Sequence, residues 1–182
     1  MVELATLQAV SYIMGSMGVF VAATYYVMNM RQAIENRKAQ LFTQITSILL
    51  QKEATQDFTE LLQLEFTDFD DFARRYDSGV NPEHYSKRAR SLNYLELIGF
   101  YVRRGQLDVE HLSTINGGGF WIVWMWEKYG EVIKRYREVL GIPEYYLNFE
   151  YLAGEVSKYQ KSRGYETKFD PRTSGSYNPD DK

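Results

Sequence analysis

Hydrophobic positions dominate the start of the chain, where residues 4–30 contain no charged side chain. An α-helix rises about 1.5 Å per residue, so about 20 mostly apolar residues are enough to cross the hydrocarbon core of a bilayer. Tyr12 lies near one end of the run and Tyr25 and Tyr26 lie near the other, where aromatic hydroxyl side chains settle at a lipid–water boundary. The pattern predicts a transmembrane helix over residues 9–30; a buried helix of a soluble protein and a cleaved signal peptide are the alternatives.

The charges that flank this segment predict its orientation. Only Glu3 is charged before it, whereas Arg31, Arg37 and Lys38 follow it closely. Basic residues favour the cytoplasmic side of a membrane. We therefore expect a single-pass protein of the cell membrane, with a short extracytoplasmic N-terminus (residues 1–8) and a cytoplasmic C-terminal domain.

Small side chains recur on one face of the predicted transmembrane helix. Their spacing of four, three and four residues forms a single seam, which consists of Ser11, Gly15, Gly18 and Ala22. Small residues let two helices approach closely in lipid, where no hydrophobic driving force acts between helices. The seam predicts a homo-oligomer formed through the anchor; the alternative is the ordinary abundance of small residues in membrane helices.

Helical periodicity continues beyond the anchor and predicts an all-α fold. No Pro or Gly interrupts residues 31–63, so we expect the membrane helix to run on into a long juxtamembrane helix. Its apolar stripe consists of Val27, Met30, Ile34, Leu41, Ile45 and Ile48. The stripe is expected to pack on the helices of the domain, and a short parallel coiled coil that extends an anchor dimer is the alternative.

Residues 31–164 are expected to form one helical cytosolic domain, a bundle divided by capping and stop residues. The predicted helix starts are Thr67 with Asp70, Asn81 with Pro82, Asp108, Phe120 after three glycines, and Ile142 with Pro143. Residues 165–182 are rich in Pro, Gly, Ser and charge, and we predict a disordered tail there.

All three tryptophans fall within residues 120–126. Trp121 and Trp124 share a helical stripe with Met125 and Tyr129, which favours a place in the core, while the two remaining aromatic residues of the run fall off that stripe. The alternative is a patch that faces a partner or the membrane interface, because tryptophan is common at both. That possible interface patch consists of Phe120, Trp121, Trp124 and Trp126.

Side chains that usually carry chemistry are sparse. The chain has no cysteine, which excludes disulfides, thiolate metal ligation and cysteine nucleophiles. Its two histidines, His84 and His111, are separated in the sequence, and we expect His84 in the exposed first turn of a helix. A formal net charge of −3 disfavours sequence-independent binding of nucleic acid.

Two further motifs have ordinary explanations. The acids Asp68, Asp70 and Asp71 lack the spacing of a calcium loop, and acids at this density are typical of a helix start. The glycines at 117–119 precede a helix, as in a phosphate-binding loop, but no Lys-Ser/Thr pair follows them. A tight corner between helices is the expected use, and we predict neither a metal site nor a cofactor.

Several segments resemble an uncharacterised family of small prokaryotic membrane proteins, a domain-of-unknown-function family. These segments are residues 25–29, residues 37–42, Gly99, residues 104–108 and residues 126–128. The resemblance covers most of residues 9–160. It implies an N-terminal anchor with a helical cytosolic domain, and it implies no established activity.

The combined pattern predicts a membrane-anchored helical interaction or scaffold protein that self-associates through its anchor. Its expected partners are the lipid bilayer, further copies of itself and a cytoplasmic protein. One alternative is a membrane-tethered enzyme whose site forms between helices, for instance from the carboxylates of Glu96 and Glu127. Another is a peripheral lipid reader that uses Lys87, Arg88 and Arg90 together with the tryptophan patch.

Overall fold

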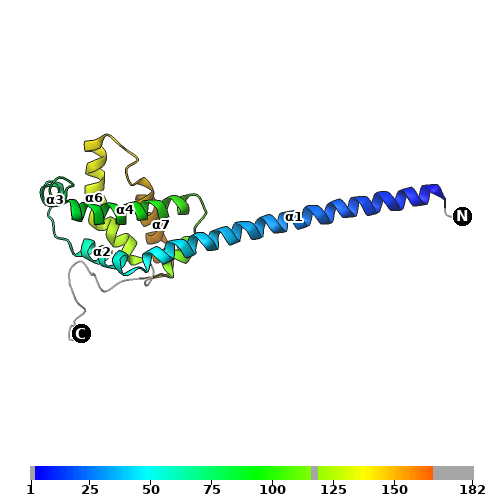
Figure 1. The fold of residues 1–182 in the computed structure, drawn as a ribbon, viewed down its shortest axis with the longest axis horizontal. Helices are drawn as coiled ribbons and strands as arrows, with labels where there is room; N and C mark the ends of the chain where they lie inside the picture. Colours follow the sequence, from blue (N-terminus) through cyan, green and yellow to red (C-terminus); the bar gives the residue numbers. More distant parts are fainter. Residues whose placement is uncertain (1–2, 116–118, 166–182) are drawn as a thin grey trace, which may run out of the picture. The chain divides into compact units, whose positions relative to one another are not determined.

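The computed structural model of the chain describes residues 3–115 and 119–165, and helices are the regular elements there (Figure 1). They are α1 (Leu4–Leu49), α2 (Lys52–Gln63), α3 (Phe69–Tyr76), α4 (Pro82–Arg103), α5 (Val109–Ser113), α6 (Phe120–Leu140) and α7 (Leu147–Ser162). The predicted all-α fold is confirmed. The chain divides into two compact units, Met1–Leu41 and Phe42–Lys182. The glycines at 117 and 118, and the predicted tail beyond Tyr165, lie outside the described residues.

The first unit ends at Leu41 and contains most of helix α1, including the whole of the predicted span over residues 9–30. Among the described helices, α1 is the one that is long and apolar enough to cross a membrane. None of its most apolar window is buried. This exposure distinguishes α1 from the core helix of a soluble protein, whose apolar side chains are covered.

Helix α1 ends at Leu49, earlier than the end near residue 63 that the lack of Pro and Gly predicts. Gln51 has extended backbone, with φ −67° and ψ 141°, and separates α1 from α2. Ile45 at the end of α1 and Leu61 in α2 are both buried. The break lets both segments place apolar residues in the core of the second unit, which is a tertiary cause that local sequence does not reveal.

The start of α3 lies one residue later than the predicted pair of Thr67 and Asp70. Asp68 is the capping residue, and its Oδ1 accepts a hydrogen bond from the backbone N–H of Asp71 at 2.8 Å. In return the backbone N–H of Thr67 donates to Oδ2 of Asp71 at 3.2 Å. The Asp71 carboxylate thus reaches back to the residue before the cap, an arrangement close to a capping box but with different members, and the carboxylates of Asp68 and Asp71 serve the helix start.

Helix α4 begins as the sequence predicts. The side chain of Asn81 accepts a hydrogen bond from the backbone N–H of His84 at 3.0 Å, and Pro82 occupies the first turn. The inner face includes the predicted Leu92, Leu95, Gly99 and Val102, all buried. It also buries a charged residue, Arg88, which the lipid-reader alternative requires at a lipid-facing surface.

Helix α7 begins at Leu147 and not at the predicted Ile142 and Pro143. Tyr146, just before the helix, has a left-handed backbone with φ 54°, a conformation that non-glycine residues seldom adopt. The guanidinium of Arg137 fixes this turn, because its Nε donates to the carbonyl of Tyr145 at 2.8 Å. The same side chain pairs with the Glu150 carboxylate at 2.7 Å. The delayed start thus results from a contact outside the turn.

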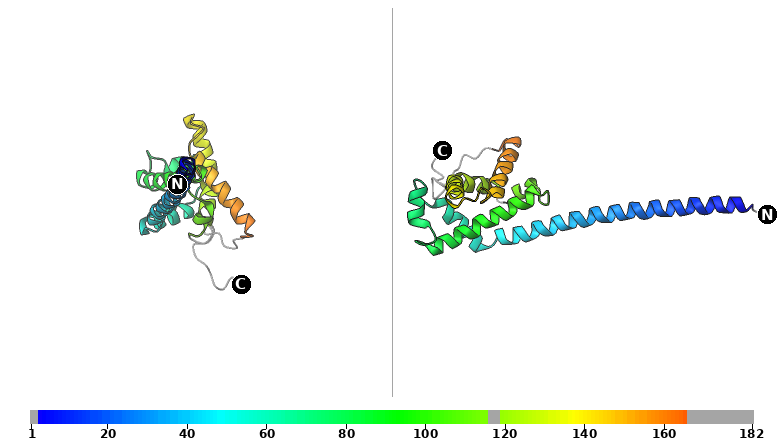
Figure 2. Two further views of the ribbon diagram at one scale, coloured as in Figure 1. Left: turned by 90° about the vertical axis from the view of Figure 1, so that its right-hand side faces the viewer. Right: turned by 90° about the horizontal axis from the view of Figure 1, so that it is seen from above.

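The core of the second unit lies between α4, α6 and α7, with α2 and α3 packed against α4 and α6 (Figure 1 and Figure 2). Tyr129 is fully buried there, and its hydroxyl donates to the carbonyl of Leu61 at 2.8 Å. Where α4 meets α7, a Cβ added at Gly99 would lie 2.0 Å from the carbonyl oxygen of Asn148. The two helices are therefore as close as a residue without a side chain allows.

Candidate functional site

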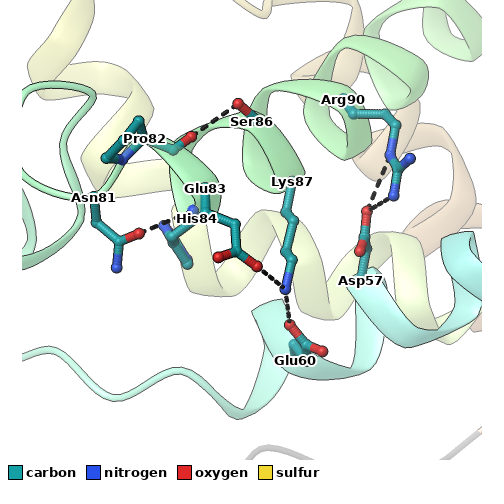
Figure 3. Close-up of polar contacts among 9 residues, drawn as sticks. All are labelled: Asp57, Glu60, Asn81, Pro82, Glu83, His84, Ser86, Lys87 and Arg90. Carbon is teal, nitrogen blue, oxygen red and sulfur yellow. Dashed lines mark hydrogen bonds and ion pairs between the residues drawn. The ribbon is translucent and has the colours of Figure 1, made fainter.

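Charged side chains of the second unit gather where α2 faces the first half of α4 (Figure 3). Asp57 on α2 is 5% exposed, and its Oδ2 accepts a hydrogen bond from Nε of Arg90 at 3.0 Å and a second from Nη2. A buried carboxylate requires such a partner, because an unpaired charge away from water is costly. Figure 3 shows the two side chains reaching toward one another from neighbouring helices.

Lys87 lies one turn away from this pair and bridges two carboxylates. Its Nζ is 2.9 Å from Glu60 on α2 and 3.3 Å from Glu83 on α4. Hydrogen bonds that Lys87 donates to these carboxylates, with the one to Glu60 the larger cause, raise the pKa of its ammonium. The bridge is exposed to solvent, so it orients the helices more than it stabilises them.

Behind this surface, Arg88 is buried among aromatic rings and is 5% exposed. Its guanidinium carbon lies 4.5 Å from the centre of the Phe72 ring, 5.4 Å from Tyr85 and 5.9 Å from Tyr136. The carboxylate of Asp77 is 3.9 Å from Nη2. A guanidinium over ring faces gains cation–π attraction, which compensates for part of its lost hydration. Arg88 thereby connects α3, α4 and α6.

His84 lies one turn before Arg88 on the same side of α4. Its ring packs against Tyr76 at 4.8 Å and Phe72 at 6.5 Å between centres. Burial, followed by the positive charge of Arg88, lowers the pKa of its imidazole below the ordinary value of 6.5. The ring is therefore neutral at pH 7, and it is half-buried rather than in the exposed turn that the sequence predicts.

Hydrogen-bonding capacity remains unused at this corner. Within the described residues, both ring nitrogens of His84, Nη1 of Arg88 and the hydroxyl of Tyr136 are buried without a hydrogen-bond partner. Burial raises the pKa of the Tyr136 hydroxyl to about 12, so this hydroxyl is protonated at pH 7. The corner holds one buried cation, one neutral imidazole and a phenol. This arrangement joins helices, and it pairs no nucleophile with a base.

The lipid-reader alternative depends on free positive charges at Lys87, Arg88 and Arg90. In the structure Lys87 is paired with Glu60, Arg90 is paired with Asp57, and Arg88 is buried. These three residues therefore do not form the unpaired basic surface that anionic lipids attract.

Glu96, one of the two carboxylates of the enzyme alternative, has a structural role. Both oxygens of Glu96 on α4 accept hydrogen bonds at the start of α7, from the backbone N–H groups of Asn148 at 3.2 Å and Phe149 at 2.7 Å. The side-chain amide of Asn148 adds a third at 2.7 Å. Glu96 is thus the N-terminal cap of α7, supplied by another helix. Glu127 lies on the exposed side of α6.

The possible interface patch lies along the first two turns of α6, and each of its members is half-buried. Trp121 meets the Phe58 ring edge-on at 5.0 Å, and Trp126 meets Phe149 in the same way at 5.3 Å. Phe120 stacks on Trp124 at 5.7 Å. Both packing and partial exposure are therefore present, and a partner-facing role for this patch stays a prediction.

The small-residue seam of the anchor is fully accessible within the first unit. Ser11, Gly15, Gly18 and Ala22 are all exposed. A Cβ added at Gly15 or Gly18 would meet no atom within 4 Å. Room for a second helix is thus present on this face, and its use stays a prediction.

The remaining candidates occupy ordinary positions. His111 is exposed on α5, and its Nδ1 lies 3.7 Å from the carboxylate of Asp108. Gly119, the described member of the three glycines, has φ 73° and lies against Val156, which fits a tight corner before α6. Across residues 3–115 and 119–165, no group of three or more His, Asp or Glu residues is placed to hold a metal ion.

Arg88 and Asp57 were not recognised from the sequence as a buried ion and a buried carboxylate. A signal was present for Arg88, because it stands four residues before Leu92 and seven before Leu95 and so belongs to the inner stripe of α4. Asp57 gave no such signal, since its partner Arg90 is remote in the sequence.

The model of a family described as Domain of unknown function (DUF4760) matches residues 13–156. No curated protein and no solved structure matches the chain.

Proposed function

The chain belongs to this family of unknown function (DUF4760), and from that premise we propose that it is a membrane-anchored helical scaffold that self-associates through its anchor. The observation that carries the proposal is the apolar part of α1, none of which is buried. An exposed apolar helix of this length is stable in lipid and unfavourable in water.

The polar groups of this helix support the same proposal. The hydroxyl of Ser16 donates to the carbonyl of Ile13, and that of Thr24 donates to the carbonyl of Phe20, both at 2.9 Å. Polar groups in the hydrocarbon region need partners within the protein. These hydroxyls find theirs in the preceding turn of the same helix.

In this proposal residues 1–8 lie outside the cell membrane and residues 31–164 form the cytoplasmic domain. The basic residues that follow the span set this orientation. The bundle presents its half-buried tryptophan patch to a cytoplasmic protein partner. Aromatic side chains that keep part of their surface exposed are common anchors of protein interfaces.

Membrane integration is tested by a charge in the centre of the span. We expect Val19→Lys to move most of the full-length chain from the membrane pellet to the soluble or aggregated fraction, because lysine at the bilayer centre costs about 3 kcal/mol. Wild-type chain should stay in the pellet after alkaline carbonate extraction. The control is Gln32→Lys, which places the same charge beyond the span and should leave the chain integrated.

A wild-type chain that carbonate releases from membranes would refute the anchor. Self-association is measured separately, by light scattering of the full-length wild type in mild detergent. A mass of two or more chains supports the proposal, and a monomer over the accessible concentration range contradicts it.

A further inference from the structure

A second face of helix α1 carries large apolar side chains at intervals of seven residues. They are Ile13, Phe20, Val27 and Ile34, with exposed fractions of 58%, 73%, 49% and 53%. Seven residues make almost two turns of an α-helix, so these side chains stand above one another in a stripe. Nothing in the first unit covers this stripe, and Leu41 continues the repeat at its end.

Two small side chains and one methionine fill the intermediate positions of the same face. Ser16, Ala23 and Met30 each follow a member of the stripe by three residues. Apolar residues at two positions of a seven-residue repeat, with small residues that allow close approach, form a pattern in which two helices interlock. We call the combined face the heptad face; it consists of Ile13, Ser16, Phe20, Ala23, Val27, Met30 and Ile34.

A shallow, open depression overlaps the middle of the heptad face at Phe20, Ala23 and Val27. The depression has a volume of about 360 Å³ and is lined by Phe20, Ala23, Thr24, Val27, Met28 and Arg31. Its first four residues are spaced i, i+3, i+4 and i+7, which are the positions that surround an inserted side chain in knobs-into-holes packing. Thr24, Val27, Met28 and Arg31 repeat the same spacing. Ala23 leaves the space that the side chain of a facing helix would fill.

We propose that the heptad face is the contact between two copies of this chain, paired in parallel and in register. The inference deepens the proposed self-association and rests on the membrane anchor. Copies inserted with one orientation present parallel helices, and a seven-residue repeat fits a helix that has the same repeat. Within the span, residues 9–30, the gain comes from filling the hollow and not from removing water.

Charge sets where the contact ends. Arg37 occupies the position of the repeat that Met30 occupies one heptad earlier. In a parallel pair the two Arg37 side chains would face each other, and like charges at such a site repel. The contact between copies therefore runs from Ile13 to Ile34 and stops before Arg37.

The heptad face differs from the small-residue seam. Successive residues turn by about 100° around a helix, so Gly15 lies about 200° and Gly18 about 140° from Ile13. The centres of the two faces are about 140° apart around α1, so they point in different directions. A pair of helices can therefore be in contact through the seam or through the heptad face. Two adjacent alanines distinguish these faces, because Ala22 belongs to the seam and Ala23 to the heptad face.

The first test exploits these adjacent alanines in the full-length chain. Ala23→Phe fills the hollow with a side chain of the same copy. We expect it to lower the association constant of the dimer in detergent about tenfold, which corresponds to 1.4 kcal/mol. Ala22→Phe is the matched control and should leave dimerisation close to wild type. Loss of the dimer with Ala22→Phe and its retention with Ala23→Phe would overturn the heptad face.

The second test uses the absence of cysteine from the sequence. Single variants Ser16→Cys, Ala23→Cys and Val27→Cys are oxidised in native membranes, with Gly15→Cys and Gly18→Cys as controls on the small-residue seam. A disulfide requires Cα atoms less than about 7 Å apart, so only the contact face should yield crosslinked dimers. Equal yields on both faces, or a higher yield at the glycines, would overturn the inference.

The two proposals fail in different ways. If wild-type chain is monomeric by light scattering and neither face crosslinks, the self-association of the anchor itself is refuted. If the wild type dimerises but the glycine positions give the crosslinks, self-association stands and the heptad face is refuted.

Discussion

At the scale of single residues, His84 and Arg88 show how a charged stretch of sequence supplies the interior of the bundle. Their side chains lie on the inner stripe of α4 and share the ring of Phe72. Capping at Asn81 was predictable because it depends on the next three residues. The burial of Arg88 depends on rings from α3 and α6, and such distant partners are not visible in local sequence.

The neutral imidazole of His84 makes stability dependent on pH. In the unfolded chain His84 takes up a proton near its ordinary pKa of 6.5, whereas in the folded chain its pKa is lower. Between these two values the unfolded state binds more protons, so the free energy of unfolding falls as the pH drops below 6.5. We expect the fall to level off below the folded-state pKa.

The variant His84→Phe keeps a ring between Tyr76 and Phe72 and removes the titrating nitrogens. We expect it to abolish this part of the pH dependence, as measured by denaturant unfolding of the full chain followed through tryptophan fluorescence. The control is His111→Phe, at an exposed site on α5. A wild-type slope in His84→Phe would show that another group causes the pH dependence.

At the scale of elements, the bundle depends on the close approach of α4 and α7. Gly99 permits this approach because a Cβ there would lie 2.0 Å and 2.5 Å from the carbonyl oxygen and carbon of Asn148. These are backbone atoms, and the cap from Glu96 holds them in place. A methyl group at position 99 therefore has no flexible neighbour that can move aside.

We expect Gly99→Ala to lower the free energy of unfolding by about 3 kcal/mol, since overpacking against a fixed backbone is costly. The matched control is Gly154→Ala on α7, where an added Cβ meets no atom within 4 Å. That variant should gain about 1 kcal/mol, because alanine favours the helix. Equal effects of the two variants in urea unfolding would contradict the close approach.

Helix boundaries divide into those that local chemistry sets and those that packing sets. Local residues are sufficient to set two boundaries: Asn81 with Pro82 starts α4, and the left-handed Gly141 ends α6. The end of α1 and the start of α7 depend on buried Leu49 and on the reach of Arg137. Nothing in the neighbouring residues carries that information, and both predictions missed for this reason.

At the scale of the whole molecule, the sequence already indicates an apolar helix followed by a helical domain. It does so because hydropathy and helical period are local averages over many residues. The candidate interfaces were harder to predict from the sequence. The heptad face needed the hollow beside Ala23 to distinguish it from an ordinary apolar stripe, and the enzyme alternative weakened only when Glu96 was placed at the start of α7.

Orientation in the membrane is testable in the same cysteine-free chain. We expect a membrane-impermeant maleimide to label Thr6→Cys in intact cells and to label Ser162→Cys only after the cells are opened. The reason is the basic flank that starts at Arg31. Labelling of Ser162→Cys in intact cells would reverse the proposed topology.

The two partners of the ion pair between Asp57 and Arg90 differ in burial, and this difference constrains the order in which they can be substituted during evolution. The Asp57 side chain is 7% exposed and that of Arg90 is 61% exposed. Loss of Arg90 first strands a charge in the interior, whereas loss of Asp57 first leaves an arginine in water. A lineage that abandons this pair must therefore change position 57 before position 90, and the permitted order of substitutions runs from the inside of the bundle outward.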